Sequence, residues 1–433
     1  MSDLGIALIT MCLMFLVGVP IYASLAISAT VTLLLSDILP VAVVQSSLFD
    51  GLNIFPLLAI PCFVVAGALM ERGNITNQII DVVRMLVGKV YGGIGITTIL
   101  ACTFFAAITG SGTSTVAAVG CVMIPAMMRN NYSPEYAGAC AATGGTIGIL
   151  IPPSNPMIIY GIICNVSITA MFTAGFIPGG IMAFALMLTA WAIAKKNGFK
   201  ADESAPSFTL KGFLFTCKKA FFSLATVFIV LGSIYSGLAT PVEASVIAVA
   251  WALFVGVVIN RALSIKDIFA SLEEGAMLCG AIVIIVGAST LFGKILTYEE
   301  APMRLANAII AFTQNKYVVM LMIVGLLYVI GMFMETLATI ILVAPVLIPV
   351  LHQLDINPIH FGILMVMANE VGLLTPPMGV NLFVASRISN VSVEKLALQV
   401  LPYIGTMTLV ILLVLFCEPI TTWLPTVLGY SSN

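Results

Sequence analysis

Gly148-Ile149-Leu150-Ile151-Pro152-Pro153 has a counterpart 224 residues further along the chain, Gly372-Leu373-Leu374-Thr375-Pro376-Pro377. The same offset relates identical residues upstream of both stretches, among them Pro134 and Pro358. Proline removes a backbone N–H donor and breaks an α-helix. The chain therefore carries an internal repeat, with a helix break at the same place in each copy.

The composition identifies the class of protein. Of the 433 residues, 61% are hydrophobic and 8% are charged, against roughly 25% charged residues in an average soluble domain. The mean hydropathy is +1.15, and several apolar runs exceed the ~20 residues that a helix needs to cross a bilayer. No long alternating pattern typical of barrel strands occurs. We therefore expect an all-α polytopic membrane protein embedded in a lipid bilayer, in which paired helix breaks point to a transport site.

Several other classes are disfavoured by the sequence. The nine cysteines are scattered without a CxxC pair, which favours packed thiols over disulfides or a metal site. The two histidines, His352 and His360, flank one turn and supply neither a metal-ligand set nor a nucleophile–base pair, so we expect no catalytic residues. A net charge of −2 without a basic cluster argues against nucleic acid, and no P-loop motif of an ATP-driven pump is present.

Membrane spans are predicted from apolar runs that end at charges and turn residues. Two apolar segments, about 93–129 and 317–352, are too long for one crossing and contain polar breaks at 109–115 and 334–336. We interpret each as a re-entrant helical hairpin, which membrane depth tolerates only where the tip is buried in protein or lines a wet cavity. The other helices are expected at about 4–18, 20–36, 53–71, 134–165 (broken), 170–194, 215–237, 241–260, 273–296, 357–388 (broken) and 396–417.

Lysine and arginine predict the orientation of these spans. If residues 195–219 face the cytoplasm, fourteen basic residues lie on that side and only Lys294, Arg304 and Lys316 lie opposite, a strong positive-inside signal. Both termini then lie outside the cytoplasm, and the first span of one repeat runs inward while its counterpart runs outward. The two repeats are therefore expected to be inverted, as in many secondary transporters.

The predicted domain organisation follows from these spans. Segments 74–90 and 298–314 mix apolar and charged positions and are interpreted as helices along opposite membrane faces, with ordinary loops as the alternative. The domains are N-terminal scaffold helices (1–52), a first inverted repeat with its hairpin (53–195), a cytoplasmic loop with scaffold helices (196–272), a second inverted repeat with its hairpin (273–417) and a C-terminal tail (418–433).

The first hairpin tip and the first helix break supply oxygen ligands suited to an alkali cation. Four hydroxyls and two glycines occupy residues 110–115, and the prolines of the break leave carbonyls without helical partners. Packing of small residues between helices is the alternative. The expected first sodium site comprises Ser111, Gly112, Thr113, Ser114, Gly145, Gly148, Pro152, Ser154 and Asn155.

The second repeat supplies a corresponding site. The C-terminal ends of half-helices favour a cation, whereas their N-terminal ends favour an anionic substrate. The expected second sodium site comprises Glu335, Thr336, Thr339, Gly372, Thr375, Pro376, Met378 and Asn381. Residues expected to bind substrate are Thr115, Asn155, Asn381 and Arg387.

Three charged residues near the breaks have competing interpretations. Ionisable residues at membrane depth are functional by default. Glu335 either lines an ion or substrate cavity or caps a helix. Glu370 holds the broken segment by hydrogen bonds in one interpretation. In another, either Glu335 or Glu370 carries a proton, which leaves proton coupling open. Arg387 either binds a substrate carboxylate bidentately or snorkels from the cytoplasmic end of a helix.

Four ordered motifs resemble the large membrane subunit of TRAP (tripartite ATP-independent periplasmic) transporters, and the resemblance covers nearly the whole chain. The motifs are Gly110-Ser111-Gly112-Thr113-Ser114-Thr115, Gly148-Ile149-Leu150-Ile151-Pro152-Pro153-Ser154, Thr240-Pro241-Val242-Glu243-Ala244 and Gly372-Leu373-Leu374-Thr375-Pro376-Pro377-Met378-Gly379-Val380-Asn381. Two residues depart from the family pattern. Val242 stands where threonine is frequent, and Arg387, where a small residue is common, is a candidate determinant of substrate choice.

The resemblance implies an elevator-type ion transporter of the bacterial inner membrane, with both termini periplasmic. Such proteins import an organic acid, a carboxylate or an acidic sugar, with co-transported Na⁺ and no organic cofactor. A periplasmic binding protein delivers the substrate, and a separate small four-helix membrane subunit is expected as partner. Proton-coupled anion transport is the alternative. An ion channel is less favoured, because a channel needs no inverted pair of broken helices.

Overall fold

The computed structural model describes residues 3–36, 40, 42–87, 89–199, 208–377 and 379–430. These residues contain no β-strand, which confirms the all-α class. The first helices are α1 (Asp3–Leu16), α2 (Ile21–Leu35) and α3 (Ala42–Leu52). The first repeat holds α4 (Ala59–Arg72), α5 (Ile75–Val87), α6 (Gly93–Thr109), α7 (Gly112–Arg129), α8 (Pro134–Thr146), α9 (Asn155–Ile163) and α10 (Ile168–Lys196).

The second repeat follows after three connecting helices. These are α11 (Leu210–Lys219), α12 (Phe221–Tyr235) and α13 (Pro241–Leu253). The second repeat holds α14 (Ile265–Tyr298), α15 (Ala301–Phe312), α16 (Lys316–Gly331), α17 (Thr336–Gln353), α18 (Pro358–Gly372), α19 (Val380–Ser389) and α20 (Val393–Phe416), and α21 (Pro419–Val427) comes last. Seven described helices are long and apolar enough to cross a bilayer, or eight if the bent pair α11 and α12 counts as one span.

The helix boundaries reproduce the sequence repeat. α8 and α18 begin at Pro134 and Pro358, the first helical position where the missing N–H of proline costs nothing. α7 and α17 begin with the same offset of 224 residues. The predicted helix breaks are confirmed between α8 and α9 and between α18 and α19. The Pro152–Pro153 and Pro376–Pro377 peptide bonds are both cis.

Two predicted helices differ from the structure, and two further helices were not predicted. The single helix expected over 215–237 is two helices, α11 and α12, bent by 68°. α11 has no fully buried residue and packs against α5, whereas the apolar α12 packs mainly against α13. α14 has 34 residues, because a capping box of Ser264 and Asp267 starts the helix before its apolar part. α3 and α21 are additional helices in segments where none was predicted.

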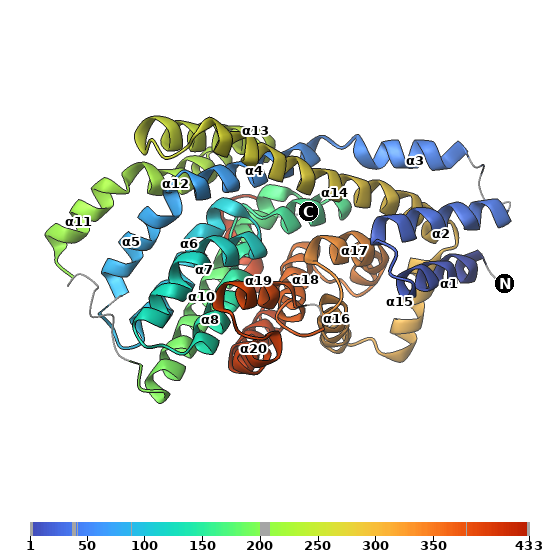
Figure 1. The fold of residues 1–433 in the computed structure, drawn as a ribbon. Helices are drawn as coiled ribbons and strands as arrows, with labels where there is room; N and C mark the ends of the chain where they lie inside the picture. The colour runs from blue at the N-terminus through green and yellow to red at the C-terminus, as the bar shows by residue number, and fades with distance from the viewer. Residues whose placement is uncertain are drawn as a thin grey trace.

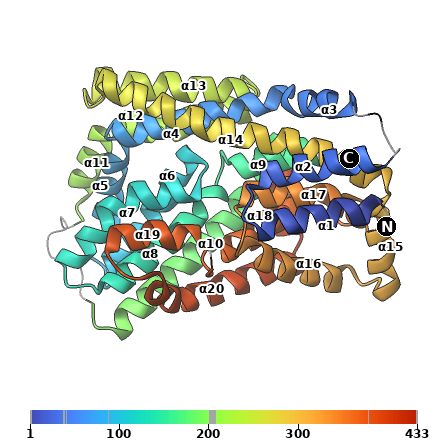
Figure 2. The ribbon, with the colours of Figure 1, turned by 45° about the vertical axis from the view of Figure 1, so that its right-hand side comes forward.

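Helices α3, α4, α13 and α14 form a layer on one side of the hairpins and broken helices (Figure 1 and Figure 2). In both views α3, α4, α13 and α14 run along the same side of the molecule (Figure 1 and Figure 2). α4 packs against α13 and α14, and α14 packs against α2 and α3. The hairpin α6–α7 meets this layer at Gly67 of α4, where a Cβ would lie 3.1 Å from Thr109 Cγ2.

In each half, the helix that follows the break packs against helices of the other half. α9, from the first half, packs against α17 and α18, whereas α19, from the second half, packs against α7 and α8 (Figure 2). The repeated glycines lie in this packing. A Cβ on Gly138 of α8 would lie 2.7 Å from Leu396 Cδ2 of α20, and one on Gly362 of α18 would lie 2.7 Å from Met171 Cε and closer still to the ring of Tyr160. Each half therefore completes the core of the other.

We predict that Gly362→Ala lowers the thermal unfolding midpoint of the detergent-solubilised protein, because the added methyl must displace the Tyr160 ring. Overpacking of this kind costs roughly 1–3 kcal/mol. Gly405→Ala is the control, since a Cβ there meets nothing within 4 Å. Equal midpoints for the two variants would contradict the exchanged packing.

Candidate functional site

The first hairpin tip contacts the first helix break through backbone atoms. Gly110 follows α6 with a positive φ of 59°, and a Cβ on it would lie 2.7 Å from the carbonyl oxygen of Pro153. The Asn155 N–H donates to the Gly110 carbonyl over 3.4 Å. Glycine adopts this conformation without steric cost and allows so close an approach. The tip of the hairpin is thereby held directly against the break.

Oxygen atoms converge beside this contact. Ser111 caps α7, and its Oγ accepts from the Ser114 N–H over 3.5 Å. The carbonyl oxygen of Ser111 lies 2.9 Å from the position of a Cβ on Gly148, and that of Gly145 lies 3.1 Å from the position of a Cβ on Gly112. The glycines therefore let the backbone of the hairpin pack directly against the backbone of the break.

The second hairpin tip meets its break through a side-chain network. A Cβ on Gly331 would lie 3.2 Å from Gly372 Cα. Beside this contact, the Thr336 hydroxyl donates to Glu370 Oε1 over 2.9 Å and accepts from Asn369 Nδ2 over 2.9 Å. All three side chains are buried. The hydrogen bond from the Thr336 hydroxyl to Glu370 supports the interpretation that Glu370 holds the broken segment.

Glu370 and Asn381 also reach the first hairpin. A Cβ on Gly112 would lie 3.4 Å from Glu370 Oε2 and 3.6 Å from Asn381 Nδ2. Asn381 is fully buried, and neither its amide atoms nor Glu370 Oε2 has a hydrogen-bond partner among the described residues. Buried polar groups without partners are costly. The junction of the two halves is therefore chemically suited to hold a further bound group.

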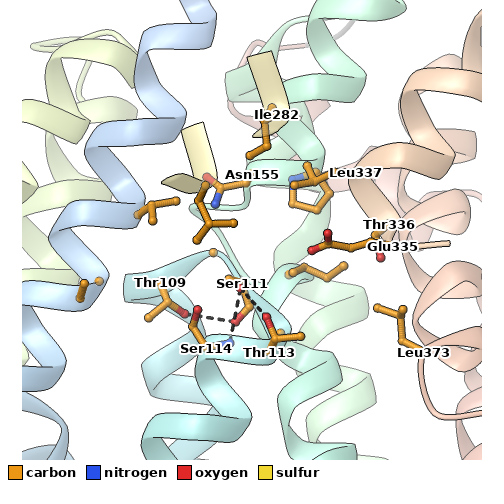
Figure 3. A pocket seen from close by; sticks show the side chains of 18 of the residues that line it. Thr109, Ser111, Thr113, Ser114, Asn155, Ile282, Glu335, Thr336, Leu337 and Leu373 are labelled. Carbon is orange, nitrogen blue, oxygen red and sulfur yellow. Dashed lines mark hydrogen bonds between the residues drawn. The ribbon is translucent and has the colours of Figure 1, made fainter. Parts of the chain in front are cut away.

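One cavity joins both tips. Its volume is about 60 Å³, room for a few water-sized groups or a small ion. Figure 3 shows Ser111, Thr113 and Ser114 of the first hairpin across the cavity from Glu335 and Thr336 of the second. Residues of α4 and α14 close the opposite wall. None of the described lining residues is a lysine or arginine, whereas four are carboxylates: Glu71, Glu274, Glu335 and Glu370.

The structure brings the residues of the predicted first sodium site together. Gly145 and Gly148 lie behind the tip, as described above. Ser154 caps α9, donating to the Ile149 carbonyl over 2.6 Å, and Pro152 is buried in the break. The members of this set that line the cavity are Ser111, Gly112, Thr113, Ser114 and Asn155.

The predicted second sodium site is only partly assembled. The hydroxyls of Thr339 and Thr375 donate to the carbonyls of Glu335 and Val371 within their own helical turns. Pro376 is exposed. Asn381 lies beside Gly112 of the first hairpin, close to Glu370, and Met378 lies outside the described residues. The members found at the second tip and its break are Glu335, Thr336 and Gly372.

Of the predicted substrate residues, only Asn155 lines the cavity. Thr115 is buried behind the tip, where its hydroxyl donates to the Ser111 carbonyl over 2.8 Å. Arg387 is exposed in the last turn of α19, which favours its interpretation as a helix-end arginine. Glu335 precedes α17 without making a side-chain cap, so the cavity interpretation is the better one for this residue.

Three lining or supporting residues were missed from the sequence. Asn369 directly precedes Glu370 in an otherwise apolar helix, a signal that could have identified it. Nothing in the local sequence marks Glu71 or Glu274 as cavity residues. Arg72 joins α4 to α14 by bonding Glu274 Oε2 over 2.9 Å and Ser271 Oγ over 2.9 Å. Glu71 and Glu274 share a position at the cavity because α4 and α14 lie side by side, which the sequence alone does not show.

The chemistry of the site suits hard cations. Its polar groups are hydroxyls, carbonyls, amides and carboxylates, which are hard oxygen donors. Among the described residues, no group of three or more His, Cys, Asp and Glu side chains could hold a metal ion.

Known proteins match this chain over nearly its whole length. Residues 8–420 match the family described as "Tripartite ATP-independent periplasmic transporter, DctM component". The chain is 38% identical over 415 residues to the isethionate TRAP transporter permease protein DctMQ of Oleidesulfovibrio alaskensis, covering 96% of this chain and 64% of that protein. The chain thus spans less than two thirds of that relative.

Two further relatives are of similar length to this chain. It is 34% identical to the sialic acid TRAP transporter large permease protein SiaM of Vibrio cholerae, covering 95% of this chain and 96% of that protein. It is also 34% identical to the C4-dicarboxylate TRAP transporter large permease protein DctM of Pseudomonas aeruginosa, covering 94% and 95%.

The fold is similar to that of a solved transporter. The crystal structure of the Alcanivorax borkumensis YdaH transporter matches with a TM-score of 0.58 over 87% of this chain and 88% of that chain. At 14% identity this likeness concerns the fold alone. Together with the family match over residues 8–420, the relatives establish that the chain is a multi-pass membrane permease and not an enzyme, and that it belongs to the DctM family of bacterial TRAP transporters.

Proposed function

We propose that this chain is the large permease subunit of a transporter that imports an organic acid together with sodium. The observation that carries the proposal is the single cavity at which both hairpin tips and both helix breaks meet. Substrate and co-ion sites of secondary transporters usually lie at such paired broken helices. The relatives are named for isethionate, sialic acid and C4-dicarboxylates, and all of these are organic acids.

The two halves, residues 53–195 and 273–417, are proposed to be inverted repeats with re-entrant hairpins. The excess of basic residues on one side supports this orientation and places both termini in the periplasm. α7 and α17 are long enough to span, but each begins at the cavity and is therefore interpreted as the second limb of a hairpin. The layer of α3, α4, α13 and α14 would stay fixed while the hairpins move as an elevator.

Two cation sites are proposed, and they differ in chemistry. The first combines the carbonyls of Ser111 and Gly145 with nearby hydroxyls, and Asn381 is reassigned to it because it lies beside Gly112. The second uses Glu335 and the Thr336 network. Proton coupling through a carboxylate is the competing proposal, because Glu335 is also an ionisable group on the cavity wall.

The substrate is proposed to bind between the tips and the wall of α4 and α14. Asn155 and the tip hydroxyls offer hydrogen bonds there. With four carboxylates and no described basic residue on the wall, bound cations would supply the attraction for an anion. A periplasmic binding protein would deliver the substrate, and a small four-helix membrane subunit would brace the permease, in keeping with the tripartite family.

We predict that the complex of permease, small subunit and binding protein in proteoliposomes takes up substrate only with an inward sodium gradient. Replacing external sodium by potassium at constant pH should reduce initial uptake at least about tenfold, which corresponds to roughly 1.4 kcal/mol or more in activation free energy. Uptake that persists in potassium and follows an imposed proton gradient would support the competing proton proposal instead.

Two hydroxyl substitutions should identify the cation sites. Ser111→Ala and Thr336→Val should each raise the sodium concentration for half-maximal uptake several-fold, since a lost polar partner costs roughly 1–3 kcal/mol. Thr103→Ala and Thr339→Val are matched controls, because those hydroxyls only donate to carbonyls within their own helical turns. A sodium dependence unchanged in both test variants would contradict the site assignment.

Arg387→Gln tests the remaining substrate candidate. Since the side chain is exposed away from the cavity, we expect the KM for substrate to stay within about twofold of wild type, the usual effect of a surface substitution. Steady-state uptake over a range of substrate concentrations measures this. A KM raised tenfold or more at unchanged protein amount would indicate that Arg387 contacts the substrate.

A further inference from the structure

A second, apolar groove lies apart from the cavity between the hairpin tips. Its volume is about 600 Å³, and it lies between α3, α9, α14, α17 and the 3₁₀ turn Phe55–Leu58. Leu57, Ile159, Ile163 and Ile341 are among its lining residues. The groove therefore lies where α3 and α14 of the layer border α9 and α17 (Figure 2), beside the hydrogen bond from the Ser289 hydroxyl to the Ile341 carbonyl.

One face of α14 forms a wall of graded polarity along the groove. Its lining residues recur every three or four positions, the spacing of one helix face: Val286, Ser289, Thr290, Gly293, Lys294, Thr297 and Tyr298. At 1.5 Å per residue this face is about 18 Å long, close to the ~15 Å that one leaflet of the ~30 Å hydrocarbon core occupies. The apolar end thus suits an acyl chain, and the polar end a headgroup.

The polar end carries one charge of each sign. Lys294 Nζ lies 3.1 Å from Asp50 Oδ2, with side-chain exposures of 40% and 59%. An exposed ion pair of this kind contributes little by itself, so each partner is available to a ligand that brings the opposite charge. A phosphate beside Lys294 and an ammonium beside Asp50 would satisfy both groups.

We propose that the groove binds a membrane phospholipid with a phosphoethanolamine headgroup. One acyl chain fills the space between α14 and the helices α9 and α17. The phosphate pairs with Lys294, and the primary ammonium donates to Asp50. Phosphatidylglycerol lacks the ammonium and phosphatidylcholine lacks N–H donors, so both should bind more weakly. The lipid would stabilise the contact between the layer and the exchanged helices, whichever ion drives transport.

Gly293 offers a direct test, because a Cβ there meets no atom within 4 Å. Gly293→Phe should place its ring in the groove without displacing protein atoms. Gly280→Phe is the matched control on the same helix, since a Cβ there also meets nothing within 4 Å and Gly280 does not line the groove. Lys294→Ala with Asp50→Asn removes the headgroup partners, and Lys316→Ala controls for loss of an exposed ion pair elsewhere.

The complex purified in mild detergent from bacterial membranes should retain phosphatidylethanolamine in native mass spectrometry. Gly293→Phe and the Lys294/Asp50 double variant should retain at least fivefold less, and both controls should match wild type. Adding palmitoyl-oleoyl phosphatidylethanolamine to the delipidated wild-type complex should raise its thermal midpoint more than the matching phosphatidylglycerol or phosphatidylcholine.

Three results would overturn the proposal. They are wild-type lipid retention by both test variants, equal stabilisation by the three lipids, and loss of the small subunit instead of lipid from the Gly293→Phe complex. The last result would show that a protein partner occupies the groove. Because none of these readouts measures transport, their failure would leave the proposed sodium coupling untouched.

Discussion

Close backbone contact between each hairpin tip and a helix break is the constraint on which the rest of the structure depends. At the first tip a Cβ on Gly148 would lie 2.9 Å from the Ser111 carbonyl, and at the second a Cβ on Gly331 would lie 2.7 Å from the Asn369 carbonyl. Side chains at these positions would push tip and break apart and would separate the carbonyls and hydroxyls that line the cavity. The repeated glycine and double proline therefore act together, since proline interrupts the helix and glycine lets the hairpin reach the interruption.

The exchange of α9 and α19 makes the two halves interdependent but chemically unequal. The first tip offers backbone carbonyls and hydroxyls beside a fully buried break, whereas the second uses a Thr336–Glu370–Asn369 network beside a break whose Pro376 is exposed. Glu370 bonds the second tip through one oxygen and lies near Gly112 of the first through the other. A group bound at that junction would therefore contact both hairpins at once. Binding at one tip would then directly change the surroundings of the other tip.

Much of this site could be predicted from the sequence because its signals are local. Prolines mark the breaks, and the run of hydroxyls and glycines at 110–115 marks the first tip, so the sequence is enough to predict that this tip and its break lie together. The positions that the sequence did not predict depend on contacts between helices that are far apart along the chain. Asn381 was assigned to its own half, because sequence order cannot show that α19 packs on the first hairpin. Likewise, Glu71 and Glu274 line the cavity only because α4 and α14 lie side by side.

The carboxylates of the cavity constrain how an organic acid could bind there. Arg72 offsets the charge of Glu274, but the described wall offers no other cation to Glu71, Glu335 or Glu370. A substrate anion entering this cavity alone would meet repulsion in a region of low dielectric, where charges interact more strongly than in water. Cations bound beforehand at the tips would weaken that repulsion. Under the proposed sodium coupling, binding of sodium before the substrate would therefore favour entry of the anion.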